Sequence, residues 1–265
     1  KKVLNQATGV ISHSPYNLEI ARQFYPEGWR APYRIIPQMI QIPQEMDEEQ
    51  HLSIRASLGY SSDDFIISTF GHIAWTKWGD RLLEAFLESS LVNDPRVHLV
   101  FAGQLAKDDF GEKLSSEISK TSIQNRIHIT GFLSKQEYDY YLQSTNLAVQ
   151  LRTKSRGGTP RGVLDCLANK IPVIVNNDAS YQDYPDDVVI KLSPEPTIAE
   201  ISKALESLVN DTVLRESYAE LGKKHVQTHH DPANCAAAYA VAIHEFVERN
   251  NKMKDKNFIP EFAAH

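Results

Sequence analysis

Short apolar runs alternate with amphipathic helical patterns along most of the chain. Most of the runs are continuously apolar and rich in Val and Ile, which is typical of strands buried on both faces. The predicted strands span residues 9–14, 65–71, 97–103, 126–131, 147–151, 171–176 and 188–192. Helical periodicity follows several of them, at 80–89, 111–120 and 135–143. The alternation predicts an α/β fold in which a parallel sheet is covered by helices on both faces.

Two regions depart from this alternation. Residues 1–42 hold one strand, a helix at 16–25 and a second strand at 33–37, and a polar, Pro-containing link over 41–50 follows. After residue 197 the periodicity is helical throughout. The predicted C-terminal helices cover 198–209, 212–226 and 233–250. We therefore expect three parts, over residues 1–42, 43–230 and 231–265.

Composition narrows the class of protein. The net charge of −6 and the pI near 5.9 argue against a nucleic-acid-binding surface. No stretch approaches the 18 apolar residues of a membrane span, and the N-terminus lacks the apolar core of a signal peptide. Cys166 and Cys235 lie far apart in helix-like contexts, which favours a reducing, cytoplasmic location. Since the chain begins without Met, we expect it to be a fragment.

Several common site motifs are missing from the sequence. It contains no GxxxxGK[ST], GxGxxG or GxSxG, which argues against P-loop NTPases, dinucleotide oxidoreductases and α/β-hydrolases. The adjacent histidines of THHDP (228–232) do not share a helical face, so we expect a structural role and no metal site. Cys166 lies among apolar helix positions and is predicted to be buried packing.

The stretch SRGGTPRGVLDCLANKIPVIV (155–175) carries the clearest chemical signal. Thr159 is a good N-cap and Pro160 suits the first position of a helix. Free N–H groups at Arg161 and Gly162, reinforced by the helix dipole, would then form an anion site for a phosphate or diphosphate. Basic residues cluster around this turn, at Arg152, Lys154, Arg156 and Arg161. The alternative is a capped helix with solvated arginines.

Other strand ends carry weaker signals. His72 and Lys77 follow the strand at 65–71, where a lysine can contact phosphate as a point charge or simply face solvent. Phe132 and Leu133 follow the strand at 126–131 and could wall a base pocket. A capping box of Ser134 and Glu137 gives that glutamate a structural role. Strand-end glycines, at positions 71, 103 and 131, permit close ligand approach but also suit any tight turn.

Taken together, four motifs resemble the C-terminal, donor-binding half of a retaining glycosyltransferase of family 4. That family has the GT-B architecture of two facing Rossmann-like domains. GVISHSPYNLEIARQFY is similar to the last strand and helix of its N-terminal domain, and FGHIAWTKWGDRLLEAF to its glycine–basic–x–lysine loop. IHITGFLSKQEYDYYLQSTNLAVQLR and GGTPRGVLDCLANKIPVIV resemble its GF segment and its E-x7-E region. The likeness covers nearly the whole chain and is nearest to members that act in polysaccharide or O-antigen assembly.

The resemblance implies a role for each matching position. Lys77, helped by His72, would contact the donor diphosphate, Phe132 and Leu133 would border the base, and Asp165 would bind the ribose hydroxyls. It implies catalytic roles for Lys77, Arg156 and Arg161. It implies donor-binding roles for Gly71, His72, Phe132, Leu133, Gly157, Gly158, Thr159, Gly162, Val163 and Asp165. No metal or other cofactor is implied, because helix-end amides and cations stabilise the leaving diphosphate in this family.

The resemblance also implies partners and parts. The substrates would be a UDP- or GDP-linked sugar and a glycan or lipid-linked acceptor. Residues 1–42 would be the remnant of an N-terminal acceptor domain with the interdomain link, and 43–230 the Rossmann-like donor domain. Residues 231–265 would form a helix and tail that pack back across the interdomain side. A longer protein would associate with a membrane only peripherally.

One departure from the family pattern leaves two hypotheses open. Gly157 and Gly158 stand where relatives carry the first glutamate, which holds the donor sugar. The chain is therefore either part of an enzyme that acts weakly on its own, or a non-catalytic nucleotide-binding or scaffolding module of a larger synthase.

Overall fold

The computed structural model describes residues 3–153 and 158–257, and its centre is a six-stranded sheet with the order β5-β4-β3-β6-β7-β8. Every neighbouring pair of strands in this sheet is parallel. The strands are β3 (Phe65–Phe70), β4 (Val97–Ala102), β5 (Ile127–Ile129), β6 (Leu147–Gln150), β7 (Val173–Asn176) and β8 (Ile190–Leu192). The chain first winds outward from β3 to β5 and then returns to pair β6 beside β3. This is the doubly wound, Rossmann-like topology, with its switch point between β3 and β6.

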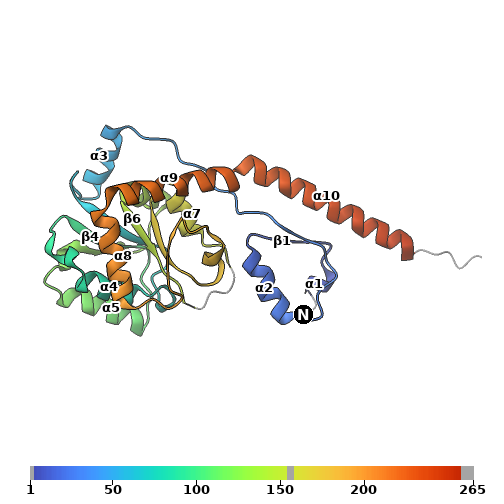
Figure 1. Ribbon diagram of the computed structural model, residues 1–265, viewed down its shortest axis with the longest axis horizontal. Coiled ribbons are helices and arrows are strands. Elements are labelled where there is room, and N and C mark those ends of the chain that lie inside the picture. The colour runs from blue at the N-terminus through green and yellow to red at the C-terminus, as the bar shows by residue number, and fades with distance from the viewer. Residues whose placement is uncertain (1–2, 154–157, 258–265) are drawn as a thin grey trace, which may run out of the picture.

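Helices cover both faces of the sheet, as the alternating pattern predicts (Figure 1). One face is packed by α6 (Lys135–Ser144), α7 (Arg161–Ala168) and α9 (Thr212–His229), and α3 (Glu48–Ser57) packs on α6. The other is packed by α4 (Gly79–Glu88), α5 (Asp109–Lys120) and α8 (Ile198–Asn210). Successive strand residues point to opposite faces, so Ile66 belongs to the first core and Ile67 to the second, and both are fully buried. The α/β prediction is confirmed.

A smaller N-terminal piece lies beside this body. It contains α1 (Val3–Gln6), α2 (Pro15–Phe24) and a two-stranded parallel ladder of β1 (Val10–Ser12) and β2 (Tyr33–Ile35). The long C-terminal helix α10 (Pro232–Asn257) leaves the body at the end of α9 and extends over this piece (Figure 1). A small core of Ile36, Cys235, Ala242 and Phe246 joins the two.

Hydrogen bonds at two places tie the N-terminal piece and its link to the body. The hydroxyl of Ser14, which caps α2, donates a hydrogen bond of 2.5 Å to Asp183 in the 3₁₀ turn Ala179–Asp183. On the connecting link, the N–H of Ile40 donates to the carbonyl of His230, whose ring nitrogen contacts the carbonyl of Gln38 at 2.7 Å. The link between the two parts is therefore held at the junction of α9 and α10.

The structure corrects the predicted link over 41–50. Helix α3 begins at Glu48, inside that segment, because Asp47 and Gln50 form a complete capping box. The predicted strands are all present but several are shorter, since β1 and β5 have three residues each and β7 begins only at Val173. The capping box of Ser134 and Glu137 is confirmed, and Cys166 is fully buried as predicted.

Candidate functional site

The loops that follow β3 and β6 meet at the switch point of the sheet, where open α/β sheets bind ligands. The N–H of Thr153, after β6, donates a hydrogen bond of 2.9 Å to the carbonyl of Thr76, after β3. The β4 loop also approaches, since a Cβ on Gly103 would lie only 1.9 Å from the carbonyl oxygen of Gly71. Close backbone packing therefore requires glycine at position 103, and three strand-end loops form one continuous edge.

Lys77 lies at the centre of this edge. It ends a 3₁₀ turn, Trp75–Lys77, and its Nζ is 3.8 Å from the point that a Cβ on Gly71 would occupy. Gly71 itself has a φ of +101°, which a glycine adopts without strain. Burial and, to a lesser extent, the positive charge of Arg152 together lower the pKa of Lys77 to about 8. A partly desolvated ammonium beside a second cation is arranged to receive an anion.

Arg152 supplies that second cation and is held rigidly. The buried side chain of Asn176 accepts a hydrogen bond from the N–H of Arg152 and donates to its carbonyl, each at 2.8 Å. The same amide donates to the carbonyl of Pro194 at 2.9 Å. The guanidinium of Arg152 lies 5.3 Å from the centre of the Tyr181 ring and donates to the carbonyl of Gly158 at 3.3 Å.

The Asn176→Ala substitution tests whether the side chain of Asn176 holds the backbone of Arg152 in place. The substitution leaves three backbone groups of Arg152 and Pro194 without their partner, so the free energy of unfolding should fall by about 2 kcal/mol. Urea denaturation measures the change. Asn177→Ala is the matched control, because Asn177 follows on the same strand end and its backbone N–H, not its side chain, bonds to Leu192. An equal loss of unfolding free energy in both variants would contradict this role of the Asn176 side chain.

Helix α7 follows β6 and points its N-terminus at the same edge. The prediction that Thr159 caps this helix is wrong, because α7 begins at Arg161 and Pro160 occupies the N-cap without a side-chain bond. The extended backbone of Pro160 (ψ 95°) moves the start by one residue. The hydroxyl of Thr159 and the Nε2 of Gln150 are buried and have no hydrogen-bond partner in the described chain. Unpaired donors therefore gather where the first N–H groups of a helix are free.

Asp165 lies one turn into α7 and makes two bonds. Its carboxylate accepts from the Nε of Arg161 at 2.7 Å and from the hydroxyl of Tyr138 at 3.1 Å. Burial raises the pKa of Tyr138, and the nearby carboxylate raises it further, so the phenol stays protonated and donates. Arg161, whose side chain is 55% exposed, is thus aligned along the helix surface by Asp165. These three side chains and Leu133 border a hollow of about 630 Å³ beneath residues 41–44 of the link.

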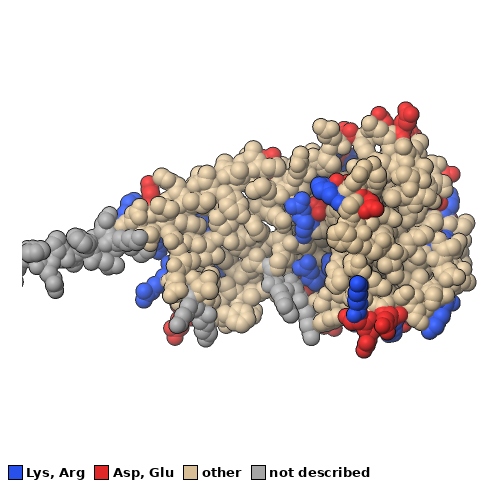
Figure 2. All heavy atoms as spheres, turned by 180° about the vertical axis from the view of Figure 1, so that it is seen from behind, with Lys and Arg blue, Asp and Glu red and all other residues tan. Residues whose placement is uncertain are grey.

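The remaining predicted residues fall into three groups. His72 and Phe132 are exposed on the edge, and the Phe132 side chain is 82% exposed. Gly162 lies over the amide of Gln150, whereas the side chain of Val163 is fully buried in the core and contributes packing beneath the site. Arg156 and Gly157 lie outside the described residues. Figure 2 shows Lys and Arg side chains gathered near the waist between the body and the N-terminal piece.

Sequence reasoning assigned no site role to Arg152, Asn176, Tyr138 or Tyr181. Arg152 belongs to the basic cluster around 152–161, so a signal for it existed. Asn176 bonds to Arg152, 24 positions away, and Tyr138 bonds to Asp165, 27 positions away. A local sequence pattern does not predict contacts over such separations.

Within residues 3–153 and 158–257, no group of three or more His, Cys, Asp or Glu side chains could hold a metal ion. No helix in the same ranges has the length and apolar character needed to cross a membrane.

Comparisons with known proteins agree on one class. The family model described as "Glycosyl transferases group 1" matches residues 51–225. No curated protein matches the chain. The structure is similar to HepE from Anabaena, solved in complex with UDP and glucose, with a TM-score of 0.78 and 16% identity over 92% of this chain. The chain spans 65% of the length of that HepE chain.

Two further solved structures show the same fold. The C-terminal domain of LpcC, a glycosyl transferase group 1 protein from Francisella tularensis, has a TM-score of 0.62 and 21% identity, covering 72% of this chain and 96% of that domain. WaaG, a glycosyltransferase involved in lipopolysaccharide biosynthesis, has a TM-score of 0.70 and 15% identity, covering 88% of this chain and 62% of its own.

Proposed function

The chain belongs to the glycosyl transferases group 1 family, and from this premise we propose that it is the donor-binding part of a retaining GT-B glycosyltransferase of family 4. The proposed reaction transfers a sugar from a UDP- or GDP-linked donor to a glycan or lipid-linked acceptor, in cell-surface polysaccharide or lipopolysaccharide biosynthesis. The proposed location is the cytoplasm, where a longer protein would associate peripherally with a membrane.

One observation carries this proposal. Lys77, Arg152 and the N-terminus of α7 converge at the switch point between β3 and β6. Two cations and free helix N–H groups match the charge and geometry of a diphosphate. HepE, which shares the fold over 92% of this chain, was solved with UDP-glucose, and that likeness supports a nucleotide sugar as the donor.

The proposed chemistry is electrostatic. As the bond between the sugar and the diphosphate breaks, negative charge builds up on the leaving oxygen, and Lys77 and Arg152 stabilise it. Asn176 fixes the backbone of Arg152, and the Tyr181 ring and the carbonyl of Gly158 contact its guanidinium, so the cation is positioned before the reaction. The acceptor would attack from the face that the diphosphate leaves, which preserves the anomeric configuration. These groups replace a metal ion in the proposed mechanism.

Asp165 is proposed to bind the ribose. Its carboxylate borders the 630 Å³ hollow and is only 15% exposed, so a bond from a ribose hydroxyl would form in a partly dry environment. Tyr138 and Arg161 hold the carboxylate in place through their hydrogen bonds. Leu133 and the exposed ring of Phe132 would then border the base.

Titration calorimetry with UDP and with GDP tests the proposal. We expect micromolar binding of at least one nucleotide, and Asp165→Ala should weaken it by about tenfold, the value of one charge-assisted hydrogen bond. Asp186→Ala is the control, because Asp186 is exposed and pairs with Lys191 away from the site. A wild-type chain that binds neither nucleotide would contradict the proposal.

A second candidate is a non-catalytic module that binds or scaffolds within a larger synthase. The observation that favours it is Gly158, which offers no carboxylate where relatives position the donor sugar; a Cβ there would meet no atom within 4 Å. Nucleotide binding without transfer to any acceptor supports a module. Absence of binding favours a scaffold. We expect little transfer by this chain alone, because it spans only 65% of the HepE chain.

A further inference from the structure

A second hollow opens on the N-terminal piece, away from the sheet edge. It has a volume of about 600 Å³ and lies between the loop from α2 to β2 and the helix α10. We call it the arginine recess. The charged and aromatic residues that line it are Arg22, Arg30, Arg34, Arg249, Trp29 and Tyr33. None of them belongs to the body that holds the proposed donor site.

The recess concentrates positive charge in an acidic chain. Four arginines and no lysine line it, although the net charge of the protein is −6. Arg34 is paired with Glu245 on α10 at 2.6 Å. Arg22, Arg30 and Arg249 form no ion pair with any residue that the structure describes. Three uncompensated guanidinium groups around one hollow therefore create a local field that attracts anions.

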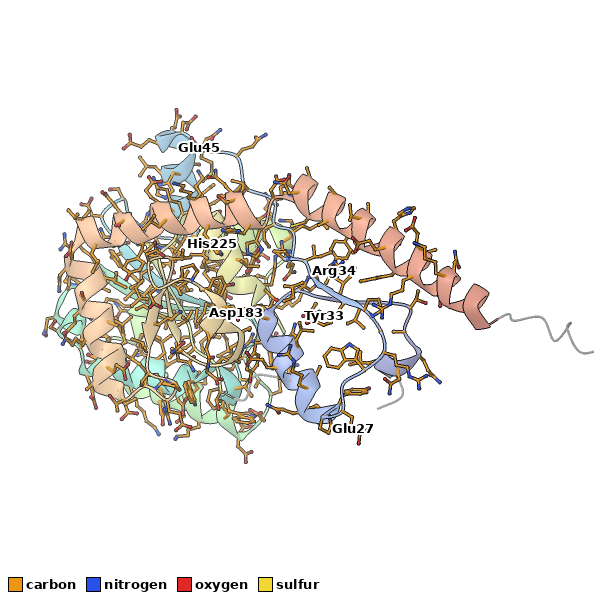
Figure 3. The ribbon with its side chains drawn as sticks, turned by 45° about the vertical axis from the view of Figure 1, so that its right-hand side comes forward. Glu27, Tyr33, Arg34, Glu45, Asp183 and His225 are labelled. Carbon is orange, nitrogen blue, oxygen red and sulfur yellow. The ribbon has the colours of Figure 1, made fainter. Side chains whose placement is uncertain are left out.

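The type of cation in the recess indicates the chemical class of its ligand. A guanidinium presents planar, paired N–H donors that match phosphate and carboxylate oxygens, whereas an ammonium acts as a point charge. The three unpaired groups come from α2, the following loop and α10, so they approach the hollow from separate segments. Figure 3 shows Glu27 at the far end of that loop from Arg34, whose own partner is Glu245 on α10.

Aromatic rings complete the recess. Tyr25, Trp29 and Tyr33 form a row, with ring centres 6.1 Å and 5.9 Å apart. Trp29 and Tyr33 both line the hollow, and the Tyr33 side chain is exposed. Rings of this kind give a ligand a large, rigid apolar surface at low cost in conformational entropy. Figure 3 shows Tyr33 and Arg34 on β2, beneath α10.

We propose that the arginine recess binds a phosphate ester carried on a sugar or on a lipid headgroup. The guanidinium groups would bind the phosphate oxygens and the aromatic row would pack against the attached ring or chain. The volume of about 600 Å³ exceeds what a bare phosphate needs and accommodates the group that carries it. This inference does not depend on the proposed transferase function, since it uses different residues on a different part of the chain.

Calorimetry with glucose 1-phosphate alone tests the recess, because UDP is itself a phosphate ester and would compete for it. The same titration of Asp165→Ala shows whether the proposed donor site contributes to the binding. Sedimentation with phosphatidylglycerol vesicles, compared with neutral phosphatidylcholine vesicles, tests the headgroup. We expect binding in one of these arms. Because each charge-assisted contact is worth about tenfold in affinity, Arg22→Gln/Arg249→Gln should weaken it by at least tenfold. Which arm responds identifies the source of the phosphate.

Arg96→Gln is the control, since Arg96 is also exposed but lies on the body and pairs with Asp94. Circular dichroism of the double variant checks folding, which should be unchanged because no side-chain hydrogen bond involves Arg22 or Arg249 within the described ranges. Binding that is absent in both arms, or that the double variant and the control lose equally, would overturn the inference. A failure of UDP to bind would contradict only the proposed function, because glucose 1-phosphate would still respond to the arginine substitutions.

Discussion

Lys77→Met is expected to lose most of its affinity for UDP and, at the same time, to become more stable at neutral pH. The Nζ of Lys77 lies beside Gly71 at the switch point, where the diphosphate is proposed to bind. Removing its charge-assisted contact should weaken UDP binding by at least tenfold, and a stronger effect on transfer is expected because charge develops on the leaving group. A loss of function coupled to a gain in stability separates a site residue from a structural one.

The gain in stability follows from the lowered pKa. Lys77 titrates at about 8 in the folded protein and at its ordinary value of 10.5 when exposed. Between these values the unfolded chain binds more protons than the folded one, so the free energy of unfolding rises with pH. Below pH 8 the folded state carries the full cost of a desolvated charge. Methionine fills similar space without that charge, so Lys77→Met should raise the stability at pH 7.

The same pKa predicts how binding depends on pH. UDP affinity should fall as the pH rises above about 8, because the neutral amine no longer attracts the diphosphate. Lys77→Met should show no such fall. Calorimetry at about pH 6.5 and about pH 9.5, with urea denaturation at both, measures each effect. Lys107→Met is the control, since Lys107 is exposed after β4 on the same edge. A Lys77→Met variant that binds UDP normally would contradict the assigned role.

The sheet could be predicted from sequence because its strands are buried on both faces. The run at 65–71 needs apolar residues at nearly every position, and the helix that follows needs them on only one side. The ends of strands were less predictable. Ile171 and Pro172 continue the apolar run before β7, yet Ile171 bonds back to the carbonyl of Cys166, in the turn that ends α7. The pattern of apolar positions predicts which residues are buried, but it does not predict which of them pair in a strand.

The candidate site was predictable in its position but not in its internal bonding. Composition and turn chemistry placed Lys77 and the start of α7 each after a predicted strand, and the structure shows that these two strands are neighbours in the sheet. The pairing of Asp165 with Arg161 and Tyr138 depends on how α6 and α7 pack side by side. Long-range contacts of this kind follow from the assembled fold, so local periodicity carries no record of them.

The start of helix α3 carries a local helix signal in the sequence, but the polar composition around it favoured a link. Asp47 and Gln50 have the spacing of a capping box, but the surrounding QIPQEMDEEQ is polar and contains proline, which is typical of a link. The helix is stabilised by one buried residue, Arg55, whose side chain is 2% exposed. Charged residues are rarely fully buried, so the pattern of apolar positions gave no weight to it.

Arg55→Met is expected to cost the protein on the order of 3 kcal/mol of unfolding free energy. Its guanidinium donates to the carbonyls of Ser61 at 3.2 Å and Ser144 at 2.8 Å, and to the carbonyl of Asp64. It thereby connects α3 to the turn before β3 and to the end of α6. Methionine fills part of the volume but leaves the carbonyls of Ser144 and Asp64 without this donor, whereas the carbonyl of Ser61 still accepts from the N–H of Asp64. Buried unpaired carbonyls carry the full desolvation penalty.

Urea denaturation of Arg55→Met and Arg96→Met measures this effect against a matched control. Arg96 is exposed and pairs with Asp94 at the surface, so its loss should change stability by about 0.5 kcal/mol or less. Burial lowers the pKa of Arg55, which means that the folded state bears a desolvation cost for the charge that methionine would relieve. If that relief outweighed the lost hydrogen bonds, Arg55→Met would be as stable as the wild type, and α3 would then be held by its apolar contacts and not by its buried arginine.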